Sequence, residues 1–291
     1  MTFNNQQISQ IKRKSLISVK RRQGFSLVEL LVALLLGSLI SAAGIQLLLT
    51  SSQSYRLQNG MSEVQEGGRF SIEYMIRDIR LAGHGMGGAA GGGDCGWGEF
   101  VTETNGKQSP IRIGTTDSPE SLNDVIDLWS GNASDVLVVH RCAVSVDDTT
   151  CLGRSVNDGV LIVSEYYVKN RNLYCKDKTA GASVVGKLVS GVESFQVLYG
   201  VRGTNDYHIS SYKTVNNIPA DSNVSAIQLG LLLTSEQYET EDGATPVTLS
   251  VSRSYDLLDK VGITVNDESG LISRKFTTTV ELRNAPRKLQ I

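Results

Sequence analysis

Few residues of this chain have the types and spacing that a catalytic site needs. Residues 181–188 nearly fit a phosphate-binding loop, but Leu188 replaces the magnesium-binding Ser/Thr. Residues 210–213 fit SxxK without the companion motifs of penicillin-binding enzymes, and residues 83–88 fit GxGxxG without a preceding strand. The sequence has no HExxH or GxSxG motif, and its three histidines and four cysteines lack CxxC or CxxH spacing. We therefore expect no catalytic residues, no metal and no cofactor.

The four cysteines are better suited to disulfides than to metal binding. Cys95, Cys142, Cys151 and Cys175 allow three pairings, and the sequence alone does not choose among them. We favour Cys151–Cys175, which would join the loop before one strand to the end of the following hairpin. Cys95–Cys142 would then tether a glycine-rich loop. A zinc site is the alternative.

One carboxylate stands out because its surroundings are apolar. Residues 25–49 contain a single charge, Glu29, and no proline. As a helix this segment is about 37 Å long, enough to cross a membrane. A carboxylate inside such a span costs about 3 kcal/mol, so Glu29 needs a partner. A cleaved secretory signal would be shorter, and a plain signal anchor leaves Glu29 unexplained.

Charge is distributed unevenly along the 291 residues. The chain has 28 Lys+Arg and 30 Asp+Glu, so no basic surplus indicates nucleic-acid binding. Six of the cations lie in residues 1–24, which have no acid, and the remaining 22 cations and 30 anions give residues 25–291 a net charge of −8. The basic leader favours a cytoplasmic N-terminus and an exported remainder.

The apolar helix is expected to continue past the membrane. Apolar or small residues recur at steps of three and four from Leu57 to Ile79, and no proline interrupts residues 25–81. Residues 50–82 therefore form an amphipathic continuation of the helix, and residues 83–98 form a glycine-rich loop that ends it.

The rest of the chain is expected to be β-rich. Apolar runs bounded by turn residues indicate strands, and residues 170–172 resemble a hairpin turn. The runs are residues 135–140, 160–163, 166–168, 173–174, 192–199, 226–233 and 276–282. One main antiparallel sheet packed on the second half of the helix would bury both apolar faces, giving an α+β fold.

The sequence GFSLVE at residues 24–29, after a basic leader and before an apolar helix, resembles the class III signal of type IV pilins. The resemblance implies that prepilin peptidase cuts between Gly24 and Phe25 and that Phe25 becomes the N-methylated first residue. Glu29 would then be the fifth residue of the mature chain. It would pair with the N-terminal amine of a neighbouring subunit and so set the register of assembly.

Later segments resemble PilW-type minor pilins, namely residues 191–200, 226–233 and 276–284. The helix-kinking proline and the C-terminal cysteine pair of many major pilins are missing. The resemblance implies a lollipop-shaped pilin with a leader (1–24), a transmembrane and assembly helix (25–49), its continuation (50–82), the glycine-rich loop (83–98) and an exported β-rich domain (99–291).

This resemblance implies a non-catalytic subunit that primes or caps type IV pilus assembly and supports twitching motility and adhesion. Its partners would be prepilin peptidase, the major pilin, other minor pilins, a tip-associated adhesin and the inner-membrane assembly platform. It would first be a single-pass inner-membrane protein with a periplasmic C-terminal domain, and then part of the surface pilus. The alternatives are a type II secretion pseudopilin and a signal-anchored periplasmic binding protein, which would retain residues 1–24.

Overall fold

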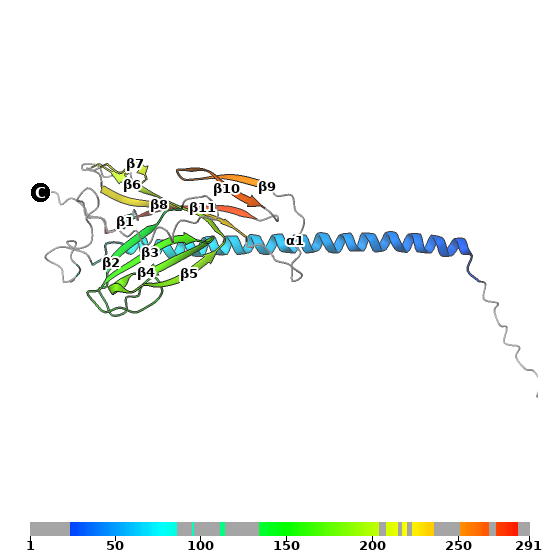
Figure 1. Ribbon diagram of the computed structural model, residues 1–291, viewed down its shortest axis with the longest axis horizontal. Helices are drawn as coiled ribbons and strands as arrows, with labels where there is room; N and C mark the ends of the chain where they lie inside the picture. The colour runs from blue at the N-terminus through cyan, green and yellow to red at the C-terminus, as the bar shows by residue number, and fades with distance from the viewer. Residues whose placement is uncertain are drawn as a thin grey trace, which may run out of the picture. The chain divides into compact units, whose positions relative to one another are not determined.

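The computed structural model places two compact units along the chain. The first ends at Ser54 and the second begins at Tyr55. The structure describes residues 24–85, 95, 111–113, 134–203, 208–214, 217–219, 223–235, 251–267 and 272–284 (Figure 1). Residues 1–23 of the expected leader, and most of the expected glycine-rich loop, lie outside the described residues.

The long helix is present. Helix α1 covers Leu27–Leu81, so it starts two residues after the expected Phe25 and ends one residue before the expected residue 82. In the first unit its side chains are exposed, and its composition and length suffice to cross a membrane. Turn residues follow Leu81, where Gly83 and Gly85 adopt positive φ values of 73° and 70°.

The α+β class with antiparallel pairing is confirmed, but the described residues of the second unit form a five-stranded, a four-stranded and a two-stranded sheet where one main sheet was expected. The five-stranded sheet has the order β1-β2-β3-β4-β5 and the four-stranded sheet the order β11-β8-β6-β7. The first consists of β1 (Ile111–Ile113), β2 (Leu137–Cys142), β3 (Leu161–Lys169), β4 (Asn172–Asp177) and β5 (Val184–Ser190). The second consists of β6 (Val192–Arg202), β7 (Ser211–Lys213), β8 (Asn223–Thr234) and β11 (Ser273–Glu281).

A glycine makes the corner at which the chain changes sheets. Gly191 lies between β5 and β6 with φ of 76°, and a Cβ there would lie 2.1 Å from the carbonyl oxygen of Thr234. The Thr234 amide donates to the Gly191 carbonyl over 2.7 Å. Only glycine fits this left-handed, crowded position, and the turn sends β6 into the second sheet beside β8.

The second half of α1 packs against strands of both sheets. Its Val64, Met75 and Ile79 join one core with Tyr166 of β3 and Phe195 of β6. These contacts place the second half of α1 in the same hydrophobic core as the two sheets.

Two consecutive glycines allow this approach. A Cβ on Gly67 would lie 2.8 Å from Cγ2 of Val189 in β5, and a Cβ on Gly68 would lie 2.3 Å from Cε2 of Phe276 in β11. Real Cβ atoms do not come this close to their neighbours, so the helix rests against the edge strands of the two sheets through bare backbone.

The expected hairpin turn after β3 is confirmed, and it also links the two sheets. Lys169 pairs with Asn172 across a two-residue turn, in which Asn170 and Arg171 have φ values of 50° and 58°. Both values suit the twist of a hairpin. The Arg171 guanidinium lies 2.6 Å from the carboxylate of Glu193 in β6, so an ion pair holds this turn against the four-stranded sheet.

A separate hairpin covers part of the four-stranded sheet. Strands β9 (Val251–Leu257) and β10 (Lys260–Asp267) pair with each other. Their Leu257 and Ile263 bury Leu232 of β8 in a second small apolar cluster. A Cβ on Gly230 would lie 3.0 Å from Cγ of Leu257, so the hairpin lies close against β8.

Candidate functional site

The segment expected to be processed is exposed and lies just before the helix. Gly24, Phe25 and Ser26 have no regular secondary structure, and the first hydrogen bond of α1 runs from the Leu30 amide to the Ser26 carbonyl over 3.1 Å. Phe25 is 84% exposed, and nothing lies within 4 Å of a Cβ placed on Gly24. The backbone at the Gly24–Phe25 bond is therefore accessible and non-helical.

Glu29 lies in the first turn of α1. The amide groups at a helix N-terminus carry partial positive charge, which stabilises a nearby carboxylate. Among the described residues no ion pair involves Glu29. Its side chain lies on the exposed surface of the helix.

The apolar part of α1 offers a large surface without packing of its own. Its leucines and isoleucines are exposed, including Leu30, Leu36, Leu39 and Ile40. Burying each such side chain is worth about 1.5–3 kcal/mol. This surface therefore favours an apolar environment, and the helix is long and apolar enough to cross a bilayer.

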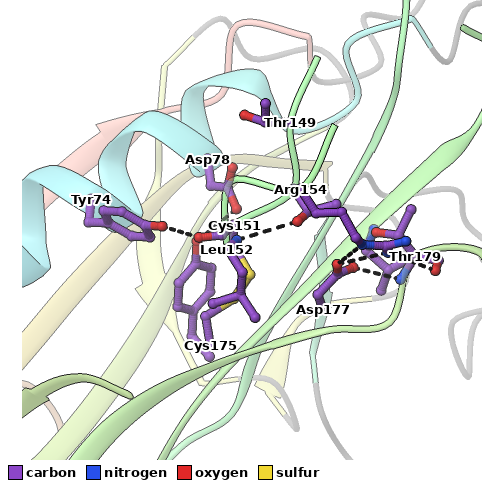
Figure 2. The surroundings of a disulfide bond; sticks show 12 residues. Tyr74, Asp78, Thr149, Cys151, Leu152, Arg154, Cys175, Asp177 and Thr179 are labelled. Atoms are coloured by element: carbon purple, nitrogen blue, oxygen red, sulfur yellow. Dashed lines mark hydrogen bonds and ion pairs between the residues drawn. A yellow bond between two sulfur atoms is a disulfide. The ribbon is translucent and has the colours of Figure 1, made fainter. Parts of the chain in front are cut away.

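In the second unit, one disulfide joins Cys151 to Cys175. Cys151 lies in the loop between β2 and β3, Cys175 lies in β4, and their Cα atoms are 6.6 Å apart (Figure 2). The sequence analysis favours this pair. The loop is also held by Arg154, which lies 2.8 Å from the buried carboxylate of Asp177. Burial raises the pKa of Asp177, but hydrogen bonds from Thr179 and Arg154 outweigh it and hold the pKa below its ordinary value.

The second disulfide joins Cys95 to Cys142, the other pair that the sequence analysis favours. The two Cα atoms are 5.8 Å apart and 47 positions separate them in the sequence. The Cys142 amide donates to the His84 carbonyl and the Gly83 amide to the His140 carbonyl, both over 2.8 Å. The chain that leaves α1 is therefore attached to the end of β2 next to this disulfide.

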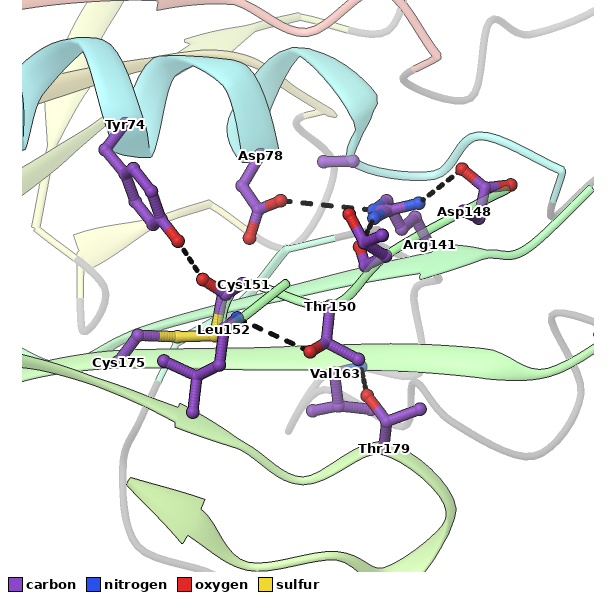
Figure 3. A network of polar contacts seen from close by, with 12 residues as sticks. Tyr74, Asp78, Arg141, Asp148, Thr150, Cys151, Leu152, Val163, Cys175 and Thr179 are labelled. Carbon is purple, nitrogen blue, oxygen red and sulfur yellow. Dashed lines mark hydrogen bonds and ion pairs between the residues drawn. A yellow bond between two sulfur atoms is a disulfide. The ribbon is translucent and has the colours of Figure 1, made fainter. Parts of the chain in front are cut away.

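A buried polar network connects α1 to the loop between β2 and β3 that contains Cys151 (Figure 3). The Tyr166 hydroxyl donates to the Asp78 carboxylate over 2.7 Å, and the Arg141 guanidinium lies 4.0 Å from the other carboxylate oxygen. The Tyr74 hydroxyl donates to the Cys151 carbonyl. Burial first, and then the charge of Asp78, raise the pKa of Tyr166 well above its ordinary value, so the phenol remains a neutral donor.

The sequence analysis missed this network. Asp78 and Ser71 are buried one heptad apart on α1, beside the apolar residues of the helix. That spacing is a usable signal, because two polar side chains on the flank of a core-facing surface need partners inside the protein. Arg141, between His140 and Cys142 on β2, carries no comparable signal, because nothing in the sequence places it opposite Asp78.

The disulfides and the polar network join the Cys151 loop to α1 and to neighbouring strands. Among the described residues there is no group of three His, Cys, Asp or Glu side chains that could hold a metal. Residues 184–190 form strand β5 where a phosphate-binding loop would need a helix. The arrangement holds a loop and a helix in place.

Two family models match separate parts of the chain. Residues 19–45 match the prokaryotic N-terminal methylation motif, and residues 160–284 match type IV pilus-assembly protein W (PilW). No curated protein sequence matches. A type IV-like pilin from Thermus thermophilus resembles the structure with 15% identity and a TM-score of 0.43, over 76% of this chain and 95% of that one.

The methylation motif includes Gly24, Phe25 and Glu29, and it opens the apolar helix that precedes the β sheets. These matches support a type IV pilin-like protein. The match over residues 160–284 extends from the end of the Cys151 loop through β11, and it supports a PilW-type minor pilin. The helix and the methylation motif indicate that the protein is anchored in a membrane.

Proposed function

We propose that this protein is a minor pilin that primes or caps the assembly of type IV pili. The observation that carries the proposal is the combination of a methylation motif on an exposed apolar helix with a PilW domain on the same chain. The apolar helix would assemble with other pilins, and the second unit would remain outside the packed helices.

Processing is the first step of this function. Prepilin peptidase would cut the exposed backbone between Gly24 and Phe25, and the new N-terminus at Phe25 would be methylated. Cleavage would remove the basic leader, residues 1–24, and leave residues 25–49 as the assembly helix. Residues 50–82 would continue that helix, residues 83–98 would form the loop after it, and residues 99–291 would form the exported domain.

Glu29 would then set the register. Its carboxylate would face the N-terminal amine of the neighbouring subunit once both helices are in an apolar environment. Each charge alone is costly there, and the two compensate each other only at one axial offset. A buried pair of this kind specifies geometry more than it adds stability.

The partners and the location follow from this pathway. We infer that the protein contacts prepilin peptidase, the inner-membrane assembly platform, the major pilin, other minor pilins and a tip-associated adhesin. It would begin as a single-pass inner-membrane protein with a periplasmic domain and end in the surface pilus. A type II secretion pseudopilin shares the N-terminal features, but the match to PilW over residues 160–284 favours the pilus.

A clean deletion tests the proposal. We expect loss of sheared surface pili and of twitching motility, both restored by the wild-type gene but not by Gly24→Val, which should leave an uncut precursor. Gly37→Val is the matched control for cleavage alone, because a Cβ on Gly37 also meets nothing within 4 Å but lies inside α1, away from the cleavage site. Normal pili in the deletion strain would contradict the proposal and favour the pseudopilin alternative.

A further inference from the structure

The two disulfides belong to opposite faces of the five-stranded sheet. Cys151 and Cys175 are part of the core that contains the second half of α1. Cys142, at the end of β2, forms a separate small cluster with Cys95. The residue before it, Arg141, approaches a carboxylate of α1 and so lies on the core face. Because successive side chains of a strand point to opposite faces, Cys142 points away from the face that holds Cys175.

All four cysteine side chains are buried, none of them more than 5% exposed. An oxidant must therefore reach the thiols before α1 packs against the sheets, while the chain is only partly folded. Each new disulfide removes two electrons and two protons from a pair of thiols. The electrons pass, through a mixed disulfide, to the disulfide of an exported thiol oxidase in the cell, or of oxidised glutathione in a purified system, which is reduced to two thiols.

In a partly folded chain, loop closure alone would favour a wrong pair. Cys142 and Cys151 are nine positions apart, whereas Cys151 and Cys175 are 24 apart and Cys95 and Cys142 are 47 apart. The probability of closure falls as the 3/2 power of loop length, so the wrong pair is favoured about fourfold over Cys151–Cys175 and about twelvefold over Cys95–Cys142. The observed pairs therefore depend either on local structure around Cys142 and Cys151 or on later rearrangement by an isomerase.

The segment between these two cysteines contains such local structure. The Asp148 carboxylate accepts hydrogen bonds from the amides of Val144 (2.8 Å) and Ser145 (3.2 Å). Its other oxygen lies 3.2 Å from the guanidinium of Arg141, which also donates to the Thr149 carbonyl (Figure 3). Because these partners lie within eight positions of each other in the sequence, they can meet before distant strands pair.

The charge of the carboxylate supports this turn. Burial raises the pKa of Asp148, but the hydrogen bond from the Val144 amide and the charge of Arg141 outweigh burial and hold the pKa below its ordinary value. The side chain is therefore ionised at neutral pH, where it accepts the amides and attracts the guanidinium at the same time.

We propose that Asp148 directs disulfide pairing by closing this turn early, which holds Arg141 on the core face and so turns Cys142 away from Cys151. Asp148 is a positioning residue, since it acts through Arg141 and the backbone and not on the thiols. Native pairing then needs an oxidant but no isomerase. This role goes beyond pilus assembly, because the pairs are selected within one chain whether or not pili form.

Oxidative refolding of the full-length protein tests the proposal. The purified chain is reduced and unfolded in urea and detergent, and then diluted at neutral pH into oxidised glutathione without an isomerase. Samples are alkylated at intervals and mapped without reduction. In the wild type we expect both observed pairs from the earliest sample and little Cys142–Cys151. In Asp148→Ala the early Cys142–Cys151 peptide should exceed the Cys151–Cys175 peptide by about fourfold, the ratio that loop closure alone gives.

Two control variants separate direction of pairing from general instability. Asp147→Ala removes the neighbouring exposed carboxylate and leaves the contacts of Asp148 in place. Gly68→Ala disturbs the packing of α1 against Phe276 and leaves the turn intact. Both variants should form the same early pairs as the wild type. Because early pairs are trapped before the domain is complete, the measurement does not depend on the final folding of any variant.

Several results would overturn the proposal. Early pairs in Asp148→Ala that match the wild type would remove the role of the turn, and so would the same wrong pair in Asp147→Ala or Gly68→Ala. A wild type that first forms mostly Cys142–Cys151 would show that rearrangement selects the pairs. The pilus-deletion experiment is independent of these results, since the refolding assay contains no pilus, so each proposal can fail without the other.

Discussion

Removing the Cys151–Cys175 disulfide should destabilise the second unit by a predictable amount. The two cysteines are 24 positions apart, and closing a loop of that length in the unfolded chain is worth about 3 kcal/mol in the chain-entropy model. The change is Cys151→Ala together with Cys175→Ala, which leaves no free thiol at the site. Cys95 and Cys142 are 47 positions apart, so the same model gives about 4 kcal/mol for that pair.

These free energies translate into measurable melting temperatures. For a domain of this size, each kcal/mol lowers the melting temperature by about 2–4 °C, so losing the first disulfide should lower it by about 6–12 °C. The measurement is thermal unfolding of the full-length protein in detergent, followed by near-ultraviolet circular dichroism. Peptide mapping without reduction first establishes that the wild-type protein contains Cys151 joined to Cys175.

The comparison with the other pair makes the reasoning refutable. If loop closure dominates, removal of Cys95 and Cys142 should lower the melting temperature at least as much as removal of Cys151 and Cys175. A drop below about 2 °C for the Cys151 pair would refute the chain-entropy argument. Peptide mapping that found Cys142 joined to Cys151 would refute the pairing on which the calculation rests.

Three further predictions concern the helix and a buried acid. Gly68→Ala should destabilise the second unit by about 1–3 kcal/mol through overpacking, less the roughly 1 kcal/mol that alanine adds to helix stability. Adding Phe276→Ala to the same chain should remove the clash. An unchanged melting temperature in Gly68→Ala would contradict the close packing at Gly68. Glu29→Gln should be cleaved normally but recovered at about a tenth of the wild-type level in sheared filaments, and normal recovery would exclude a register role. The pKa of Asp177 is lower in the folded state than in the unfolded state. The ionised carboxylate therefore stabilises the fold above the unfolded-state pKa, and this stabilisation is lost as the pH falls through the folded-state pKa. Urea unfolding of Asp177→Asn between pH 6 and pH 3 should therefore show a weaker loss of stability than the wild type, and parallel pH profiles would contradict this.

The sequence predicts the helix well because its features are local. The spacing of apolar residues from Leu57 to Ile79 and the lack of proline determine α1 without reference to the rest of the chain. The hairpin turn at Asn170 and Arg171 is local in the same sense, since two strands joined by two residues must pair. These are the elements that the sequence analysis places within a few residues of their observed bounds.

The division into two sheets escapes such reasoning because it depends on a distant contact. Strands β5 and β6 are separated by Gly191 alone, and nothing in the sequence shows that the Thr234 carbonyl will lie against that glycine. The hairpin of β9 and β10 was also missed, although Val261, Ile263 and Val265 recur at every second position, which is a usable strand signal. Its burial arises only after Leu232 and Gly230 of β8 offer it a surface.

The residues of the candidate site also differ in whether the local sequence is enough to predict them. Gly24, Phe25 and Glu29 can be proposed from the sequence because they belong to a short continuous motif, in which sequence neighbours are spatial neighbours. Asp78, Arg141 and Tyr166 come from α1, β2 and β3, so their meeting is a property of the folded domain. The polarity of each residue was visible in the sequence, but its partner was not.

The glycine pair and the polar network complement each other along the second half of α1. Gly67 and Gly68 set how closely the helix approaches the two sheets, but apolar contact at one level leaves rotation about the helix axis poorly defined. Asp78 lies ten residues further on, about 15 Å along the helix, and its hydrogen bond from Tyr166 is directional. A helix fixed by close packing at one level and by a directional bond at another can neither slide nor rotate without breaking one of them.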